Sequence, residues 1–90
     1  VPGGLFILDE PEAALSPISQ LGLISMIREM THKDGQFIIA THSPILMALP
    51  GASILDLDRE PPAFIQYNDL ENVKLYRSFL ENPDTFISRL

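Results

Sequence analysis

Two pairs of polar residues in this 90-residue sequence could carry out chemistry together: Asp9 with Glu10, and Thr41 with His42. One carboxylate of an acidic pair can hold Mg²⁺ through water while its neighbour polarises an attacking water, a division of work that phosphoryl transfer requires. A neutral imidazole beside hydroxyl groups can hydrogen-bond a phosphate oxygen or orient a water. Taken singly, each pair could also be a solvated strand end with no function. The case for chemistry depends on whether the two pairs meet.

The apolar runs that precede these pairs predict two strands that end at the same edge of a sheet. The runs are Leu5–Leu8 and Phe37–Ala40, and each is bounded by turn-forming residues. A short unbroken apolar run is typical of a strand that is buried on both faces, as in a parallel sheet. Pro11 ends the first strand because proline has no amide for a sheet ladder. Open α/β sheets bind ligands beyond the carboxyl ends of parallel strands, so we expect the acids and the imidazole there.

The segment between the two runs predicts a helix. Ser16 and Pro17 form a helix start, with a hydroxyl cap followed by proline at the first helical position. Apolar residues then recur at helical spacing and predict a packed stripe: Leu21, Leu23, Ile24, Met26, Ile27 and Met30. Gln20, Arg28 and Glu29 are expected on the solvent side. A helix over about 17–33 completes a right-handed βαβ unit with parallel strands, so the fold class is α/β.

The second half of the chain predicts smaller elements. They are a helical turn in Pro44–Leu49, a strand in Ser53–Leu57, an edge strand in Ala63–Tyr67, a helix carrying Leu70, Val73, Tyr76, Phe79 and Leu80, and a last turn after Pro83. We therefore expect a βαβ portion over 1–50 and a portion of strands and a helical tail over 51–90, both within one domain.

Composition excludes several classes of protein. A chain with 46% hydrophobic residues is too apolar for a disordered tail, and a chain without cysteine has no thiolate metal site. The net charge of −6 argues against electrostatic binding of nucleic acid or anionic lipid over the whole surface. Basic and aromatic residues in the tail could hold a nucleic-acid strand, but acids surround them, so helix packing is favoured. No membrane-spanning run is present, and we expect a cytoplasmic protein.

Three motifs resemble those of ATP-binding-cassette (ABC) type ATPases. Leu5–Pro11 resembles the Walker B motif, Glu12–Ser16 resembles the D-loop, and Ile38–Ser43 resembles the H-loop. The form Asp-Glu-Pro-Glu-x-x-Leu-x-Pro is most similar to the soluble branch that contains RecF-like, SMC-like and "predicted ATPase" proteins. The resemblance covers about Leu5–Pro44. It implies a fragment of a P-loop NTPase domain, with a parallel βαβ unit followed by strands and helices.

This resemblance also implies roles for individual residues. Asp9 would be the acid on the Mg²⁺ side, Glu10 the general base, and His42 a contact to the γ-phosphate. Glu12 and Ser16 would belong to a segment that faces a partner subunit across an ATP-sandwich homodimer, with ATP and Mg²⁺ as ligands. Ser16 departs from the pattern because many D-loops have aspartate there. For Glu12, however, a solvated loop acid is the favoured interpretation.

Other motifs of the family do not occur in the sequence. It contains no Gly-x-x-x-x-Gly-Lys-Ser/Thr phosphate loop and no Ser-Gly-Gly-type signature. We therefore expect this chain to be the C-terminal part of a longer ATPase that is inactive by itself. The family's sheet places the phosphate-loop strand beside the strand that ends at His42. We expect that edge to be filled by the upstream Walker A portion, by strand exchange with a second copy, or by a rearrangement.

Two alternative interpretations remain open. A superfamily-2 helicase also has an Asp-Glu motif followed by a Ser-Ala-Thr strand, which Ala40 and Thr41 partly match. Pro11 directly after the acids argues against this interpretation, as does the lack of a second RecA-like domain downstream. The other alternative is a non-enzymatic βαβ interaction module whose acids are surface charge. The residues upstream of Val1 in the parent gene would discriminate among the three.

Overall fold

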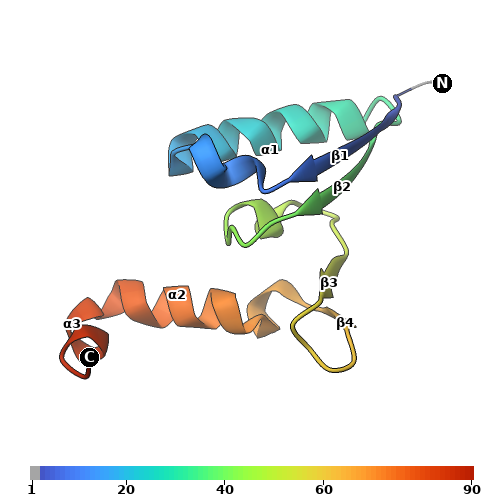
Figure 1. Cartoon of the computed structure of the whole chain (residues 1–90). Helices are drawn as coiled ribbons and strands as arrows, with labels where there is room; N and C mark the ends of the chain where they lie inside the picture. Colours follow the sequence, from blue (N-terminus) through green and yellow to red (C-terminus); the bar gives the residue numbers. More distant parts are fainter. Residues whose placement is uncertain (1–2) are drawn as a thin grey trace. The chain divides into compact units, whose positions relative to one another are not determined.

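The computed structural model describes residues 3–90 and shows a mixed α/β chain (Figure 1). The chain divides into two compact units, one that ends at Leu49 and one that spans Pro50–Leu90. No helix in the described range is long and apolar enough to cross a membrane.

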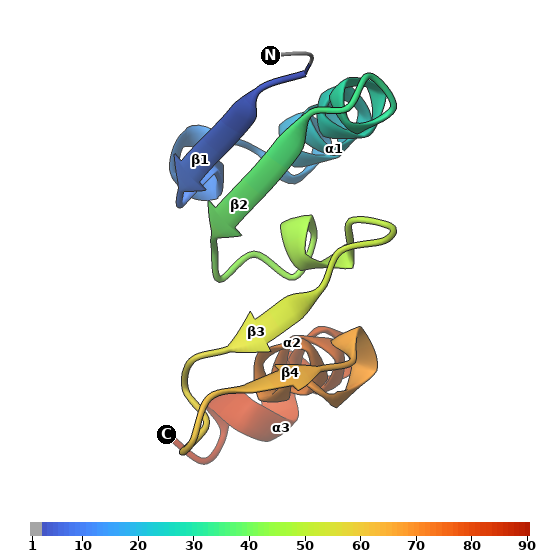
Figure 2. The same ribbon diagram turned by 90° about the vertical axis from the view of Figure 1, so that its right-hand side faces the viewer.

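The first unit is a βαβ unit followed by a helical turn, as the sequence predicted. Its elements are β1 (Leu5–Asp9), η1 (Pro11–Ala14), α1 (Pro17–Thr31), β2 (Gln36–Ala40) and η2 (Leu46–Ala48). β1 and β2 lie side by side and parallel, with Phe6 opposite Phe37 and Asp9 opposite Ala40 (Figure 2). The parallel pairing confirms the predicted βαβ unit and brings the carboxyl ends of both strands to one edge.

Residues at its two ends define α1. Ser16 caps the start, because its Oγ accepts a hydrogen bond from the Ser19 amide at 3.2 Å. The helix ends at Thr31, two residues before the predicted end. Gly35 then turns the chain into β2, where its amide donates to the Met30 carbonyl at 2.9 Å. A Cβ on Gly35 would lie 2.8 Å from that carbonyl oxygen, so the close approach requires glycine.

The two faces of the β1–β2 sheet differ in burial, which corrects the prediction that both are buried. Phe6 and Phe37 are half-buried on the α1 side and stack with ring centroids 5.0 Å apart. On the other face, Ile7 is 72% exposed and Ile38 is 60% exposed. A parallel sheet needs helices on both faces to be fully buried, and this unit contains one crossover helix.

The predicted apolar stripe of α1 packs only in part. Ile27 is the most deeply buried side chain, at 1% exposure, and Leu23 and Met30 are half-buried. Leu21 and Met26 are about half exposed, so the expectation that the whole stripe is packed was wrong for these two residues. The reason is geometric, because a two-stranded sheet covers a narrower arc of the helix than the stripe spans.

The second unit pairs its strands in a separate sheet. β3 (Ile54–Asp56) and β4 (Ala63–Ile65) are antiparallel, and η3 (Tyr67–Asp69), α2 (Glu71–Glu81) and α3 (Pro83–Ile87) follow. Both strands, the α2 helix and the break before Pro83 agree with the predicted elements. Leu70 and Val73 are buried, and Phe79 packs on Phe86 with ring centroids 5.8 Å apart. These contacts fit the expectation that the tail's aromatic residues pack within the fold for Phe79 and Phe86, but Tyr76 is 47% exposed, so the expectation was wrong for that residue.

Candidate functional site

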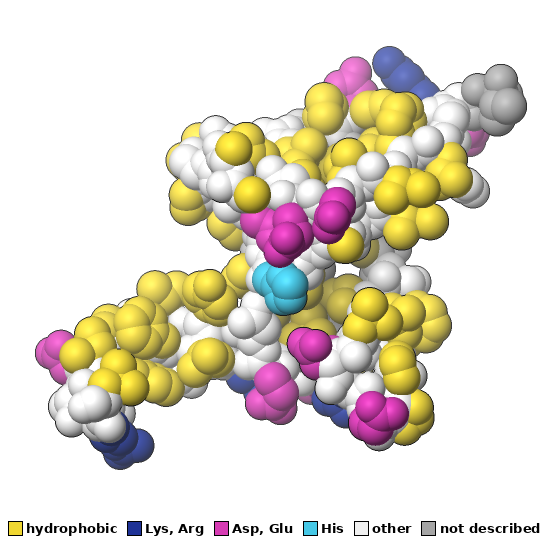
Figure 3. Space-filling view, in the orientation of Figure 1, with side chains coloured by type: hydrophobic (Ala, Val, Ile, Leu, Met, Phe, Trp, Pro, Cys, Tyr) yellow, Lys and Arg dark blue, Asp and Glu magenta, His cyan; other side chains and the backbone are white. Residues whose placement is uncertain are grey.

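The predicted site residues of both strands lie at one edge of the β1–β2 sheet. The ladder continues one residue past β1, where the Glu10 amide donates to the Ala40 carbonyl at 2.7 Å. Asp9 and Glu10 are therefore placed beside Thr41 and His42. Figure 3 shows acidic side chains grouped beside a histidine at the end of this sheet. The spatial meeting that the sequence predicted is thus present in the structure.

Glu10 and His42 approach each other directly. His42 Nδ1 lies 3.3 Å from Glu10 Oε1, and the two side chains are 79% and 57% exposed respectively. Glu10 lies in the left-handed region, with φ 46° and ψ 55°, so it belongs to a turn rather than to β1. Non-glycine residues rarely adopt this conformation, and such outliers cluster at functional sites. The turn, rather than strand alternation, directs the Glu10 carboxylate toward His42.

Glu12 makes contacts that its interpretation as a solvated loop acid does not predict. Its Oε1 accepts the Thr41 hydroxyl at 2.7 Å, and its Oε2 accepts the His42 backbone amide at 3.1 Å. Burial by itself raises the pKa of Glu12. The pKa is nevertheless lowered, because the carboxylate accepts hydrogen bonds from Thr41, from its own amide and from the His42 amide, and is attracted by His42. Glu12 is therefore a carboxylate at neutral pH, bound to both residues that follow β2.

A buried polar contact joins the same loop to α1. Ser43 Oγ donates to Gln20 Oε1 and accepts the amides of Ile45 at 3.2 Å and Leu46 at 3.1 Å. Gln20 and Ser43 are only 9% and 6% exposed, so the prediction that Gln20 faces solvent was wrong. The missed signal was spacing, because Gln20 precedes the buried Ile27 by two helical turns and shares its face.

The remaining predicted residues are Asp9 and Ser16, and both are exposed. The Ser16 hydroxyl is engaged as the α1 cap and also donates to Ser19 Oγ at 3.1 Å. Within the described residues, no group of three or more acidic or histidine side chains could hold a metal by itself. Mg²⁺, however, is commonly held by one or two carboxylates together with phosphates and water. The exposed Asp9 carboxylate at a strand end fits that kind of site.

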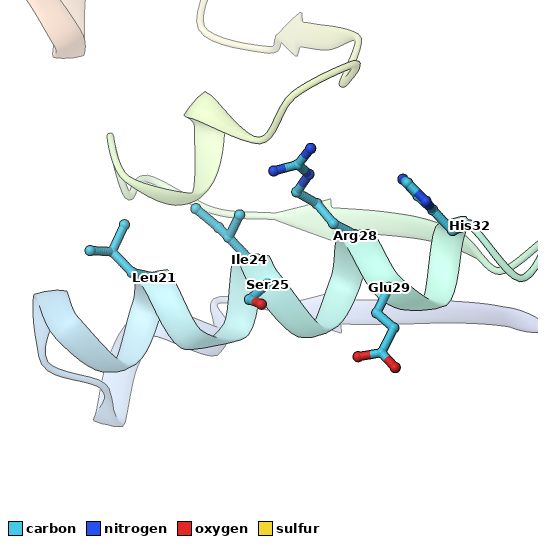
Figure 4. A pocket seen from close by; sticks show the side chains of 6 residues that line it. All are labelled: Leu21, Ile24, Ser25, Arg28, Glu29 and His32. Carbon is cyan, nitrogen blue, oxygen red and sulfur yellow. The ribbon is translucent and has the colours of Figure 1, made fainter.

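A surface pocket on α1 lies apart from these residues. Its lining side chains are Leu21, Ile24, Ser25, Arg28, Glu29 and His32 (Figure 4). In the close-up, Arg28 extends to one side of the helix and Glu29 to the other. The pocket contains none of the predicted site residues, so the candidate site is the sheet edge.

Comparison with known proteins identifies the family. The family model described as "AAA domain, putative AbiEii toxin, Type IV TA system" matches residues 1–48. This match covers more than half of the 90-residue chain and includes every predicted site residue. No curated protein and no solved structure matches the chain at a significant level. The chain therefore belongs to this AAA domain family, a family of P-loop ATPase-like domains with an ATPase-type nucleotide-binding function.

Proposed function

We propose that residues 3–49 form the hydrolytic half of an ABC-type ATP site, completed by a phosphate loop from a Walker A portion upstream in the same protein. The observation that carries this proposal is the 3.3 Å approach of His42 Nδ1 to Glu10 Oε1 at the carboxyl edge of a parallel strand pair. General bases need hydrogen-bond reach to the water they activate, and Glu10 has its carboxylate exposed at the edge where such a site would form.

In this proposal each residue has one task. Glu10 accepts the proton of the attacking water, and the His42 imidazole contacts the outer phosphate. Asp9 holds Mg²⁺, which when bound neutralises charge on the phosphates. The segment from Glu12 to Ser16 faces a second subunit across the nucleotide.

The lack of a phosphate loop in the sequence supports the proposal that this chain needs additional segments for activity. Phosphate loops hold the nucleotide through backbone amides and a lysine, and no such loop occurs in these 90 residues. Within the described range, β1 and β2 pair only with each other, and Ile7 and Ile38 are exposed on the open face. An upstream strand that adds to this sheet would place a phosphate loop at the same edge as Glu10 and His42. We therefore propose that the chain alone does not hydrolyse ATP.

The test is Glu10→Gln in the full-length protein, with ATP binding and steady-state turnover measured in parallel. The substitution keeps size and hydrogen-bonding capacity but removes the base, so binding should persist while turnover falls by about 10²- to 10⁴-fold. Glu29→Gln is the matched control, because Glu29 is an exposed acid of the same unit whose partner is Lys33 at 3.7 Å. Undiminished turnover in Glu10→Gln would remove Glu10 from the base role.

A further inference from the structure

The Glu12 carboxylate contacts two residues that lie far from it in the sequence. Its contact to Thr41 joins residues 29 positions apart, and its contact to His42 joins residues 30 positions apart. One oxygen accepts the Thr41 hydroxyl and the other accepts the His42 amide, so the two contacts hold two successive residues of the chain that leaves β2. Hydrogen bonds to an ionised carboxylate are roughly twice as strong as neutral ones, and two of them also fix orientation.

The loop after β2 is held from its other side as well. Thr41 Oγ1 accepts the Ser43 amide at 3.0 Å, while Ser43 Oγ is bonded to Gln20 of α1. The His42 backbone is thus fixed between η1 and α1, although its imidazole is 79% exposed beside Glu10. A fixed backbone under an exposed functional side chain is how a site is preorganised for its ligand.

The ionisation of Glu12 agrees with this arrangement. Its lowered pKa keeps both oxygens available as acceptors across the physiological range. Because both oxygens already contact Thr41 and His42, Glu12 differs from Asp9 and Glu10, for which the structure gives no comparable backbone contact by the carboxylate.

We propose that Glu12 is a positioning residue for His42: its carboxylate binds the Thr41 hydroxyl and the His42 amide and thereby places the imidazole beside Glu10. This inference rests on the proposed function, in which His42 contacts the outer phosphate. It assigns Glu12 to the placement of His42 rather than to direct contact with a nucleotide.

A graded series at Glu12 tests the proposal in the full-length protein. Glutamine can keep both contacts if the Thr41 hydroxyl reverses and accepts, but it lacks the charge, whereas alanine removes both contacts. The hydrogen-exchange rate of the His42 backbone amide, measured by NMR, should therefore rise in the order wild type, Glu12→Gln, Glu12→Ala, with about a tenfold increase for alanine. The kcat for ATP should fall in the same order, with a smaller change in KM. Glu29→Ala should change neither quantity.

A second pair of variants separates positioning from general loss of structure. Thr41→Val removes the hydroxyl and should lower kcat as Glu12→Ala does, while Thr41→Ser restores the hydroxyl and should recover most of that loss. Combining Glu12→Ala with Thr41→Val should lower kcat little further, because both variants remove the hydrogen bond between Thr41 and Glu12.

The outcomes distinguish this inference from the proposed function. If Glu10→Gln abolishes turnover while Glu12→Ala and Thr41→Val turn over like wild type, Glu12 does not position His42 and the proposed function stands. If Glu10→Gln leaves turnover unchanged, the proposed function fails and the catalytic part of this inference fails with it. An unchanged exchange rate of the His42 amide in Glu12→Ala would overturn the contact itself, whatever the activity.

Discussion

The Nδ1 atom of His42 lies 3.3 Å from Oε1 of Glu10, although the two residues are 32 positions apart in the chain. Two features of the fold produce this contact. The parallel register of β1 and β2 brings both strand ends to one edge, and the left-handed conformation of Glu10 turns its carboxylate along that edge. The contact is exposed, which is the condition under which a nucleotide could reach both groups.

The pH dependence of stability should include a contribution from Glu12. Its pKa in the folded chain is below the ordinary value of 4.5, so the unfolded chain binds more protons in the interval between the two values. The stabilisation is present above pH 4.5 and is lost as the pH falls through the folded pKa. Urea denaturation at a series of acidic pH values should therefore show a weaker decline in the free energy of unfolding for Glu12→Gln than for wild type. An equal decline in both proteins would contradict this contribution, and Glu29→Gln serves as the control.

The buried hydroxyl of Ser43 should be important for stability. Ser43→Ala leaves the Gln20 side chain and the amides of Ile45 and Leu46 without their partner, so we expect a loss of about 2–3 kcal/mol in the free energy of unfolding. The measurement is urea denaturation at neutral pH. Ser25→Ala, at an exposed position of α1, should stay within about 0.5 kcal/mol of wild type. Similar losses in both variants would show that the Ser43 contacts contribute nothing specific.

Two glycines offer a matched comparison of steric effects. A methyl group on Gly35 would lie 2.8 Å from the Met30 carbonyl oxygen, so Gly35→Ala should destabilise the chain by about 1–3 kcal/mol. A methyl group on Gly22 meets no atom within 4 Å, and Gly22→Ala in the middle of α1 should stabilise it by about 0.5–1 kcal/mol. Thermal denaturation of the two variants should therefore shift in opposite directions. A stabilised Gly35→Ala variant would show that the turn before β2 adapts freely.

The single fully buried core side chain of α1 should matter more than the exposed sheet residues. Ile27→Ala should cost about 2–4 kcal/mol of unfolding free energy, since Ile27 is 1% exposed. Ile7→Ala in the isolated chain should cost far less, because Ile7 is 72% exposed. In a full-length protein whose upstream segment covers that face, Ile7→Ala should approach the cost of Ile27→Ala. An equally small effect of Ile7→Ala in both proteins would argue that the face stays open.

Much of the fold could be predicted from the sequence because its signals are local. The unbroken apolar runs located β1 and β2, and Ser16 with Pro17 located the start of α1. The exposure of the sheet face that carries Ile7 and Ile38 could not be predicted. An unbroken apolar run does not indicate how many helices cover a strand. Gln20 was placed on the solvent side from its polarity, although its spacing to Ile27 marks the sheet side.

The candidate site was predictable in its location but not in its contacts. The meeting of Glu10 and His42 follows from parallel strands that end at one edge. The bond from Thr41 to Glu12 depends on how η1 folds back after the left-handed turn at Glu10, and no sequence pattern encodes that turn. Side-chain contacts between loops depend on tertiary geometry, so they cannot be predicted from periodicity or capping rules.

The most direct test of the central claim is a double-mutant cycle on turnover in the full-length protein, with Glu10→Gln, His42→Ala and the combined variant. If both residues act on one nucleotide, each single variant should lower kcat strongly and the combined variant should be about as slow as the slower single variant, because residues that act as a unit are not additive. Losses that simply multiply, or a His42→Ala variant with wild-type kcat, would contradict a shared site at this edge of the sheet.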